Sequence, residues 1–128
     1  MDQRAKTILI VDDSELVLRS MAELFDLEGY FVHTAKDGQE ALKKMEELTV
    51  DVILLDCRLP GMEGPEVAER IRGGTGPEKS TPIIGMSIDN PRRREKECLK
   101  AGMNRFVDKS SGPDKIIEEV NRAVSAIQ

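Results

Sequence analysis

Apolar positions along the chain follow two alternating patterns. Short runs of β-branched and aliphatic residues have the length and composition of buried strands. They occupy residues 7–11, 30–34, 51–56, 82–88 and 105–108. Between these runs, apolar residues recur three or four positions apart, which is the period of an amphipathic helix. These helical patterns cover residues 14–29, 37–48, 65–71, 90–102 and 113–127. The sequence therefore predicts five strands that alternate with five helices.

Residues typical of helix ends support the same boundaries. Ser14 is placed to cap the first helix, and Asp37, followed three residues later by a glutamate, makes a start that resembles a capping box. Pro65 suits the first turn of the third helix. Asn90 and Pro91 start the fourth. These signals agree with the apolar spacing at each point.

Strands that alternate with helices pair in parallel through right-handed crossovers. A chain of 128 residues forms one domain by the usual size range. We therefore predict a single α/β domain over residues 1–128, a doubly wound, flavodoxin-like (βα)5 fold with strand order 2-1-3-4-5. Residues 73–80, GGTGPEKS, are a linker-like segment, and its first part, residues 73–76, lacks the Lys-Ser/Thr partner of a P-loop and is predicted to form a flexible loop.

Composition narrows the class of protein. The chain is 39% apolar and 34% charged, and no run approaches the ~20 apolar residues of a membrane span. Residues 1–6 lack the apolar core of a signal peptide, so we expect a cytoplasmic protein without a membrane partner. The net charge of −5 argues against direct nucleic-acid binding. Cys57 and Cys98 suggest neither a metal site nor a disulfide framework. Cys57 is interpreted as a small core residue, with a redox switch as the alternative.

Acidic residues stand at the ends of two predicted strands. In the stretch VDVILLDCRLPGM, an apolar run stops at Asp56 just before a Pro-Gly turn, and the first strand ends in Asp12 and Asp13. In open α/β sheets the carboxyl ends of the strands are where ligands bind, and strands 1 and 3 meet at the switch point. Three carboxylates held together there repel one another. Hard oxygen ligands favour Mg²⁺ or Mn²⁺ as the compensating cation.

Two more polar residues end the remaining strands, namely Ser87 and Lys109. A hydroxyl and an ammonium that face a metal and a carboxylate make a site of phosphoryl size. An aspartate can attack phosphorus and form an aspartyl phosphate. The residues alone thus favour phosphoryl chemistry at Asp56.

Four segments resemble the receiver domain of two-component response regulators. They are IVDDS, ILLDCRLPGMEG, TPIIGMS and AGMNRFVDK, and they occur in the family's order and spacing over residues 8–126. A chemotaxis receiver is itself a standard example of the 2-1-3-4-5 order, so the resemblance implies that topology too. The last segment, after RRREKECLKA, also resembles receivers fused to hybrid histidine kinases. The architecture of the parent protein therefore stays open.

The resemblance implies a role for each site residue. Asp56 would be the phosphoacceptor and Lys109 would pair with the acyl phosphate. The metal ligands would be Asp13, Asp56, the backbone carbonyl of Arg58 and, through water, Asp12. Ser87 and Phe106 would be the switch residues that repack the face formed by helix 4, strand 5 and helix 5. The donor would be a sensor histidine kinase or phosphotransfer protein, and that face would bind a downstream protein or a second copy of the chain.

Three positions depart from the family pattern. Ser110 replaces the usual proline after the lysine, and the Lys109-Ser110 bond is either cis at a cost of ~3–4 kcal/mol or trans with Lys109 approaching differently. We take the cis form as the prediction. Ile88 replaces a commonly small residue and is expected to restrict access to the phosphate. Arg58 and Asp89 flank the site, and we expect them to pair across its mouth and slow dephosphorylation.

Other classes fit parts of the sequence. The first is an enzyme, an aspartyl-phosphate phosphatase of the haloacid dehalogenase type, which needs a second aspartate where this chain has Arg58. The second is a flavin carrier, but the segment VDDSEL is acidic where an anion-binding loop belongs. The third is a pseudo-receiver that binds proteins without phosphorylation. We predict a signalling domain and no enzyme.

Overall fold

A single five-stranded parallel sheet forms the centre of the computed structural model, which describes residues 5–89 and 91–126. The order β2-β1-β3-β4-β5 confirms the predicted topology, and the strand boundaries lie within one residue of those predicted. The strands are β1 (Thr7–Val11), β2 (Phe31–Ala35), β3 (Val52–Asp56), β4 (Ile83–Ser87) and β5 (Arg105–Asp108).

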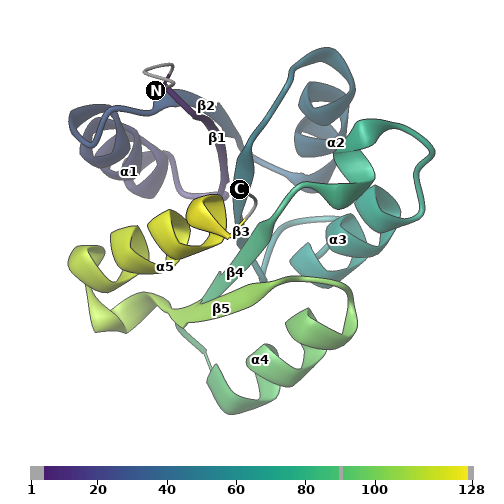
Figure 1. Cartoon of the computed structure of the whole chain (residues 1–128). Helices are drawn as coiled ribbons and strands as arrows, with labels where there is room; N and C mark the ends of the chain where they lie inside the picture. Colours follow the sequence, from purple (N-terminus) through teal and green to yellow (C-terminus); the bar gives the residue numbers. More distant parts are fainter. Residues whose placement is uncertain (1–4, 90, 127–128) are drawn as a thin grey trace.

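Five α-helices cover both faces of this sheet, as Figure 1 shows. One face is covered by α1 and α5, and the other by α2, α3 and α4. The helices are α1 (Glu15–Leu27), α2 (Gly38–Glu47), α3 (Gly64–Arg72), α4 (Pro91–Lys100) and α5 (Pro113–Ser125). None of the helices in the described ranges has the length and hydrophobicity to cross a membrane.

The core consists of two apolar clusters, one on each face of the sheet. Successive side chains of a strand point to opposite faces, so every strand at the centre of the sheet contributes to both clusters. On β3, Ile53 and Leu55 face α2, α3 and α4, whereas Val52 and Leu54 face α1 and α5. All five residues of β3 are buried. This burial holds Asp56, the last residue of β3, at a fixed place on the sheet edge.

Helix ends follow the sequence signals. The Ser14 side chain accepts the backbone N–H of Val17, and that of Asp37 accepts the N–H of Glu40. The carboxylate of Glu40 in turn accepts the N–H of Lys36, one residue earlier than in a strict capping box. Proline stands in the first turn of α3 as predicted. Two predicted helix ends, Asn90 at the start of the fourth helix and Ile127 at the end of the fifth, lie outside the described residues.

The second half of the linker-like segment 73–80 has regular structure, which its composition did not predict. Pro77–Ser80 forms a short 3-10 helix. The guanidinium of Arg72 donates to the carbonyls of Lys79 and Thr81, each at 2.9 Å, and so ties the segment to α3. A contact of this kind leaves no sign in the composition of GGTGPEKS.

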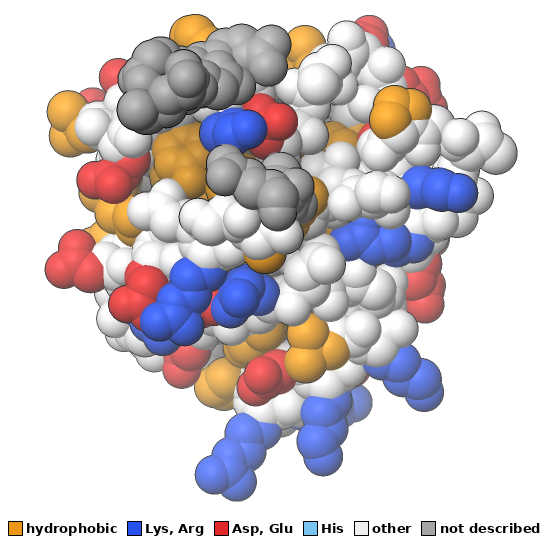
Figure 2. Space-filling view, viewed as in Figure 1, with side chains coloured by type: hydrophobic (Ala, Val, Ile, Leu, Met, Phe, Trp, Pro, Cys, Tyr) orange, Lys and Arg blue, Asp and Glu red, His pale blue; other side chains and the backbone are white. Residues whose placement is uncertain are grey.

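The helix α4 buries fewer side chains than the other four helices. Its only buried side chain is that of Cys98, and basic residues dominate its exposed surface. In the space-filling view, Lys and Arg side chains project from the region where Figure 1 places α4 (Figure 2). The exposed surface of this helix is therefore solvated and mainly charged.

Gly64 gives a test of the packing that holds the loop after β3. A Cβ at this position would lie 2.8 Å from the Cα of Cys57 and against the Asp56 carbonyl oxygen, so backbone would have to move. We expect Gly64→Ala to lower the free energy of unfolding by about 1–3 kcal/mol in urea titrations. Gly73→Ala, at the other end of α3, is the control, because its Cβ would meet nothing closer than 3.3 Å. Equal stability of the two variants would contradict this packing argument.

Candidate functional site

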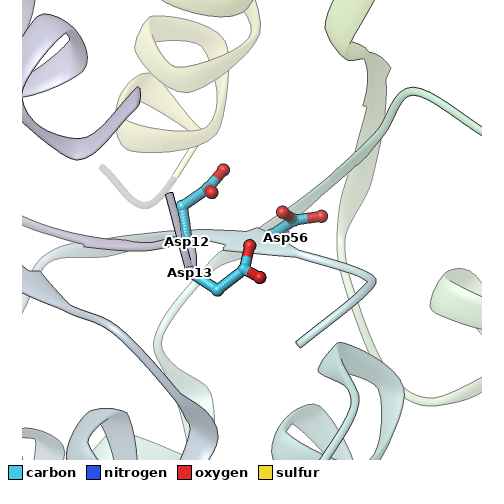
Figure 3. A group of neighbouring side chains, drawn as sticks. All are labelled: Asp12, Asp13 and Asp56. Atoms are coloured by element: carbon cyan, nitrogen blue, oxygen red, sulfur yellow. The ribbon is translucent and has the colours of Figure 1, made fainter. Parts of the chain in front are cut away.

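Three aspartates meet at the carboxyl edge of the sheet. Asp12 and Asp13 follow β1, and Asp56 ends the neighbouring strand β3, as Figure 3 shows. One carboxylate oxygen from each lies within 4.8 Å of the other two. Asp12 and Asp56 are buried, whereas Asp13 is exposed to solvent. The structure thus brings together the acidic cluster that the strand pattern predicts.

The side chain of Lys109 connects two of these acids, Asp12 and Asp56. Its ammonium donates to Asp12 at 2.5 Å and to Asp56 at 3.1 Å. Burial alone would lower the pKa of Lys109, but the two carboxylates raise it, so the side chain stays charged. The sequence predicts an ammonium that faces a carboxylate, but it does not identify Asp12 as a partner of Lys109.

The carboxyl group of Asp56 has an unusual proton affinity. Burial raises its pKa to about 6, and the negative charge of Asp12 adds to the effect. The backbone N–H of Arg58, 3.2 Å from Asp56 Oδ1, and the ammonium of Lys109 act in the opposite direction. At neutral pH the group is therefore ionised but poorly stabilised, which suits a nucleophile.

Charge at the site is out of balance. In their ordinary ionised forms, three carboxylates and one ammonium leave two negative charges uncompensated. All the acidic ligand atoms are carboxylate oxygens, which are the ligands that Mg²⁺ and other hard cations prefer. The residues present therefore fit a divalent cation.

The two predicted switch residues lie on neighbouring strands. Ser87 ends β4, and its hydroxyl donates to the carbonyl of Asp89 at 3.0 Å. Phe106 pairs in register with Gly85, two residues before Ser87, so both side chains lie on the same face of the sheet. Phe106 is half-buried against the cluster that contains Cys98. Within the described residues Ser87 makes no hydrogen bond to Asp56.

Arg58 and Asp89 form the ion pair that the sequence predicts. The Arg58 guanidinium lies 2.9 Å from the Asp89 carboxylate, and both side chains are more than half exposed. This contact joins the loop after β3 to the loop after β4. Ile88 lies beside it with 66% of its surface exposed, so its side chain projects outward from the site.

The predicted cis bond between Lys109 and Ser110 is wrong. No peptide bond in the described ranges is cis. Lys109–Ser111 forms a short 3-10 turn in which the Asp108 carboxylate accepts both the N–H and the hydroxyl of Ser110, at 3.0 and 2.8 Å. Asp108 therefore stabilises the turn without the proline that the resemblance calls for, and Lys109 still reaches both acids.

Sequence reasoning also missed the pairing of the two cysteines. The sulfur atoms of Cys57 and Cys98 are in contact, although 41 residues separate them in the chain. Both side chains are fully buried, which agrees with the interpretation of Cys57 as a core residue. The fold alone brings them together, because nothing in their spacing resembles a known motif.

An acidic cluster and a lysine at the carboxyl edge of a 2-1-3-4-5 sheet define the receiver class of signalling domains. Comparison with known families agrees: the sequence model described as "Response regulator receiver domain" matches residues 8–121. The chain belongs to this family, and it is a receiver module of two-component phosphorelay signalling.

Several proteins of known identity resemble the chain. It is 35% identical over 90% of its length to part of the CAI-1 autoinducer sensor kinase/phosphatase CqsS of Vibrio cholerae, covering 17% of that protein. It is 33% identical over 94% of its length to the transcriptional regulatory protein ResD of Bacillus subtilis, covering 49% of it. The chain thus spans half or less of these relatives.

Solved structures give the same result for the fold. The receiver domain of sensor histidine kinase PA1611 from Pseudomonas aeruginosa PAO1 has a TM-score of 0.86 and 27% identity, with 95% of this chain and 99% of that one covered. That structure has a magnesium ion coordinated in the active site cleft. The chemotaxis protein CheY4 of Vibrio cholerae has a TM-score of 0.86 and 28% identity, with 94% and 99% covered.

The raised pKa of Asp56 predicts how stability depends on pH without metal. The folded state holds the Asp56 proton up to about pH 6, whereas an ordinary aspartate loses it near 3.8, so ionisation costs stability progressively over that interval and fully above it. In buffer with a chelator, we expect Asp56→Asn to raise the free energy of unfolding by about 1–3 kcal/mol at pH 7.5 and not at pH 3.5.

The matched control for this test is Asp26→Asn, on the exposed surface of α1. It should leave the free energy of unfolding within about 0.5 kcal/mol of the wild type at both pH values. A loss of stability in Asp56→Asn at pH 7.5 would mean that its contact with Lys109 outweighs burial, contrary to our account.

Proposed function

We propose that this receiver domain accepts a phosphoryl group on Asp56 from a phosphohistidine of a sensor kinase or phosphotransfer protein, in a reaction that requires Mg²⁺ or Mn²⁺. The observation that carries the proposal is the position of the Asp56 carboxylate, which lies among Asp12, Asp13 and Lys109 at the sheet edge. The proposed role is that of a phosphoacceptor in signalling and not of an enzyme that turns over a small substrate.

The contacts of the acids support different roles for them in metal binding. Asp12 already uses one oxygen for the N–H of Ser14 and the other for Lys109, so we assign it to the metal through water. Asp13 is exposed and would bind the metal directly, together with Asp56 and the carbonyl of Arg58. The bound cation supplies positive charge to the phosphoryl oxygens as they approach the acids.

The groups around Asp56 indicate how the phosphoryl group would be transferred to it. Its Oδ2 attacks phosphorus while the bond from phosphorus to the donor imidazole breaks, and the imidazole leaves with the electron pair of that bond. The N–H of Arg58 holds Oδ1 and so orients the carboxylate. The ammonium of Lys109 lies 3.1 Å from Oδ2, so it can donate a hydrogen bond to an oxygen of the arriving, negatively charged phosphoryl group.

The switch then begins at Ser87. A phosphoryl group adds ~−1.5 to −2 charge and three acceptor oxygens. We propose that Ser87 exchanges its hydrogen bond to the Asp89 carbonyl for one to the phosphoryl group. Space vacated by Ser87 would be filled by Phe106 on the same face of the sheet, which alters the surface of α4, β5 and α5 that a downstream protein or a second copy binds.

An apolar groove beside Lys109 supports a protein donor. It lies between α1 and the start of α5 and is lined by Leu16, Val17, Met21, Leu24, Pro113 and Ile116. Leu16 is 74% exposed, so this surface offers apolar area to a partner. A helix that carries a phosphohistidine would bury this area while it presents the phosphoryl group to Asp56.

Intact-mass measurement tests the phosphoacceptor role. Incubated with acetyl phosphate and Mg²⁺, the wild type should gain the mass of one phosphoryl group, and the gain should be lost with a chelator or in Asp56→Asn. Asp26→Asn should gain the phosphoryl group as the wild type does. An unmodified wild type would favour a pseudo-receiver that works without phosphorylation.

The exposed Arg58–Asp89 pair predicts a modest effect on the phosphoryl lifetime. The pair crosses the mouth of the site and hinders the water that attacks phosphorus, but exposed ion pairs contribute only ~0–1 kcal/mol. We expect Arg58→Ala, Asp89→Ala and the double variant each to shorten the lifetime by about 2- to 5-fold, with no further loss in the double variant.

Arg70→Ala is the control for the lifetime measurement. It breaks an exposed pair of similar length, 3.0 Å to Glu66 on α3, away from the acids. Its phosphoryl lifetime should equal that of the wild type. An unchanged lifetime in the Arg58, Asp89 double variant would show that the pair does not restrict the water.

A further inference from the structure

Cys57 and Cys98 join the phosphoacceptor strand to the helix α4. Cys57 directly follows Asp56, and its backbone is fixed on both sides: its N–H donates to the Met86 carbonyl, and its carbonyl accepts the N–H of Gly64. Cys98 is the only buried side chain of α4. Their sulfur atoms are in contact, so the one buried side chain of α4 meets the residue next to Asp56.

The strand β4 is shaped to let these sulfur atoms meet. At Gly85, a Cβ would lie 3.3 Å from Cys98 Sγ and 2.6 Å from Met103 Sδ. Without a side chain at Gly85, Cys98 and Met103 pack against the main chain of β4 with no adjustment. The close packing of Cys98 therefore involves β4 as well as Cys57.

The main-chain distance shows what a covalent bond would require. The two Cα atoms are 7.2 Å apart, whereas formed disulfides have Cα separations of about 4.4–6.8 Å. A disulfide would therefore draw Cys98, and with it α4, toward the end of β3. Because Cys57 is held by backbone hydrogen bonds, we expect α4 to be the element that moves.

We propose that Cys57 and Cys98 are an oxidative modification site, at which a reversible intramolecular disulfide fixes α4 against the phosphoacceptor strand. With a peroxide as oxidant, one thiol is oxidised to a sulfenic acid as the peroxide O–O bond breaks and one water leaves. The second sulfur attacks the first, and the hydroxyl leaves with a proton as a second water. The two sulfur atoms together lose two electrons, and the peroxide gains them.

Burial controls when this reaction occurs. Both side chains are fully buried, so the oxidant reaches them only when α4 moves away from the sheet. The helix α4, with one buried side chain and a charged exposed surface, is suited to such opening. In a reducing compartment a disulfide of this kind is transient, as redox-sensing disulfides are.

A consequence for signalling rests on the proposed function. The helix α4 borders the surface that Ser87 and Phe106 are proposed to alter, and Arg94 of α4 also lies 3.5 Å from Glu63 in the loop after β3. A disulfide at Cys98 would add a covalent link between the same two segments. Oxidation would then restrain the change in α4 that phosphorylation causes.

Thiol counting tests the modification site without any need for phosphorylation. Wild-type protein is treated with hydrogen peroxide, denatured and alkylated with N-ethylmaleimide, and its intact mass is then measured. We expect a monomer that carries no N-ethylmaleimide and is lighter by two hydrogen atoms than the reduced chain. After reduction with dithiothreitol, the chain should take up two N-ethylmaleimide groups. Peptide mapping should find Cys57 linked to Cys98. The control variant Cys98→Ala should form no intramolecular disulfide. Should this variant fail to fold, the peptide mapping of the wild type still tests the proposal.

Two results would overturn the site. One is a wild type that still takes up two adducts after oxidant treatment, and the other is a chain that gains oxygen atoms or links to a second chain instead. Hydrogen exchange then tests the consequence: exchange of α4 amides should change on phosphorylation in the reduced protein and not in the oxidised one. If the reduced protein takes up no phosphoryl group, the proposed function fails while the disulfide result stands.

Discussion

The structure depends on one constraint, the confinement of negative charge at the carboxyl edge of the sheet. Asp12 and Asp56 are buried at the ends of adjacent central strands, and Asp13 completes the cluster. In the described part of the chain, Lys109 is the basic side chain that reaches them, through contacts with both buried acids. The site therefore retains an excess of negative charge, and the burial that raises the pKa of Asp56 is the same burial that excludes water from it.

The fold followed from the sequence because its signals are local and repeated. Apolar runs, helix caps and first-turn prolines specified the five strands and five α-helices, and alternation limited the topology to a few choices. The start of β2 shows the limit of this reasoning. Tyr30 looks like a strand residue, but its N–H donates to the Phe25 carbonyl at 3.0 Å, so it belongs to the turn after α1.

The acidic cluster was predictable for a similar reason, since strand ends that share an edge bring their terminal residues together. Contacts between loops were not. The trans bond at Lys109 follows from the Asp108 side chain, and the order of residues 77–80 follows from Arg72. The meeting of Cys57 and Cys98 depends on the packing of α4 against the sheet. The contacts of Asp108 and Arg72 are short in sequence but follow no pattern that predicts them, whereas the cysteine contact joins segments that are far apart in the chain.

The central claim is that Asp56, among three neighbouring aspartates, is the residue that accepts the phosphoryl group. Borohydride reduction converts a phosphorylated aspartate to homoserine, so peptide sequencing after reduction identifies the modified position directly. Our account predicts homoserine at position 56 only, in protein phosphorylated with Mg²⁺ present. Homoserine at position 12 or 13, with position 56 unchanged, would contradict it.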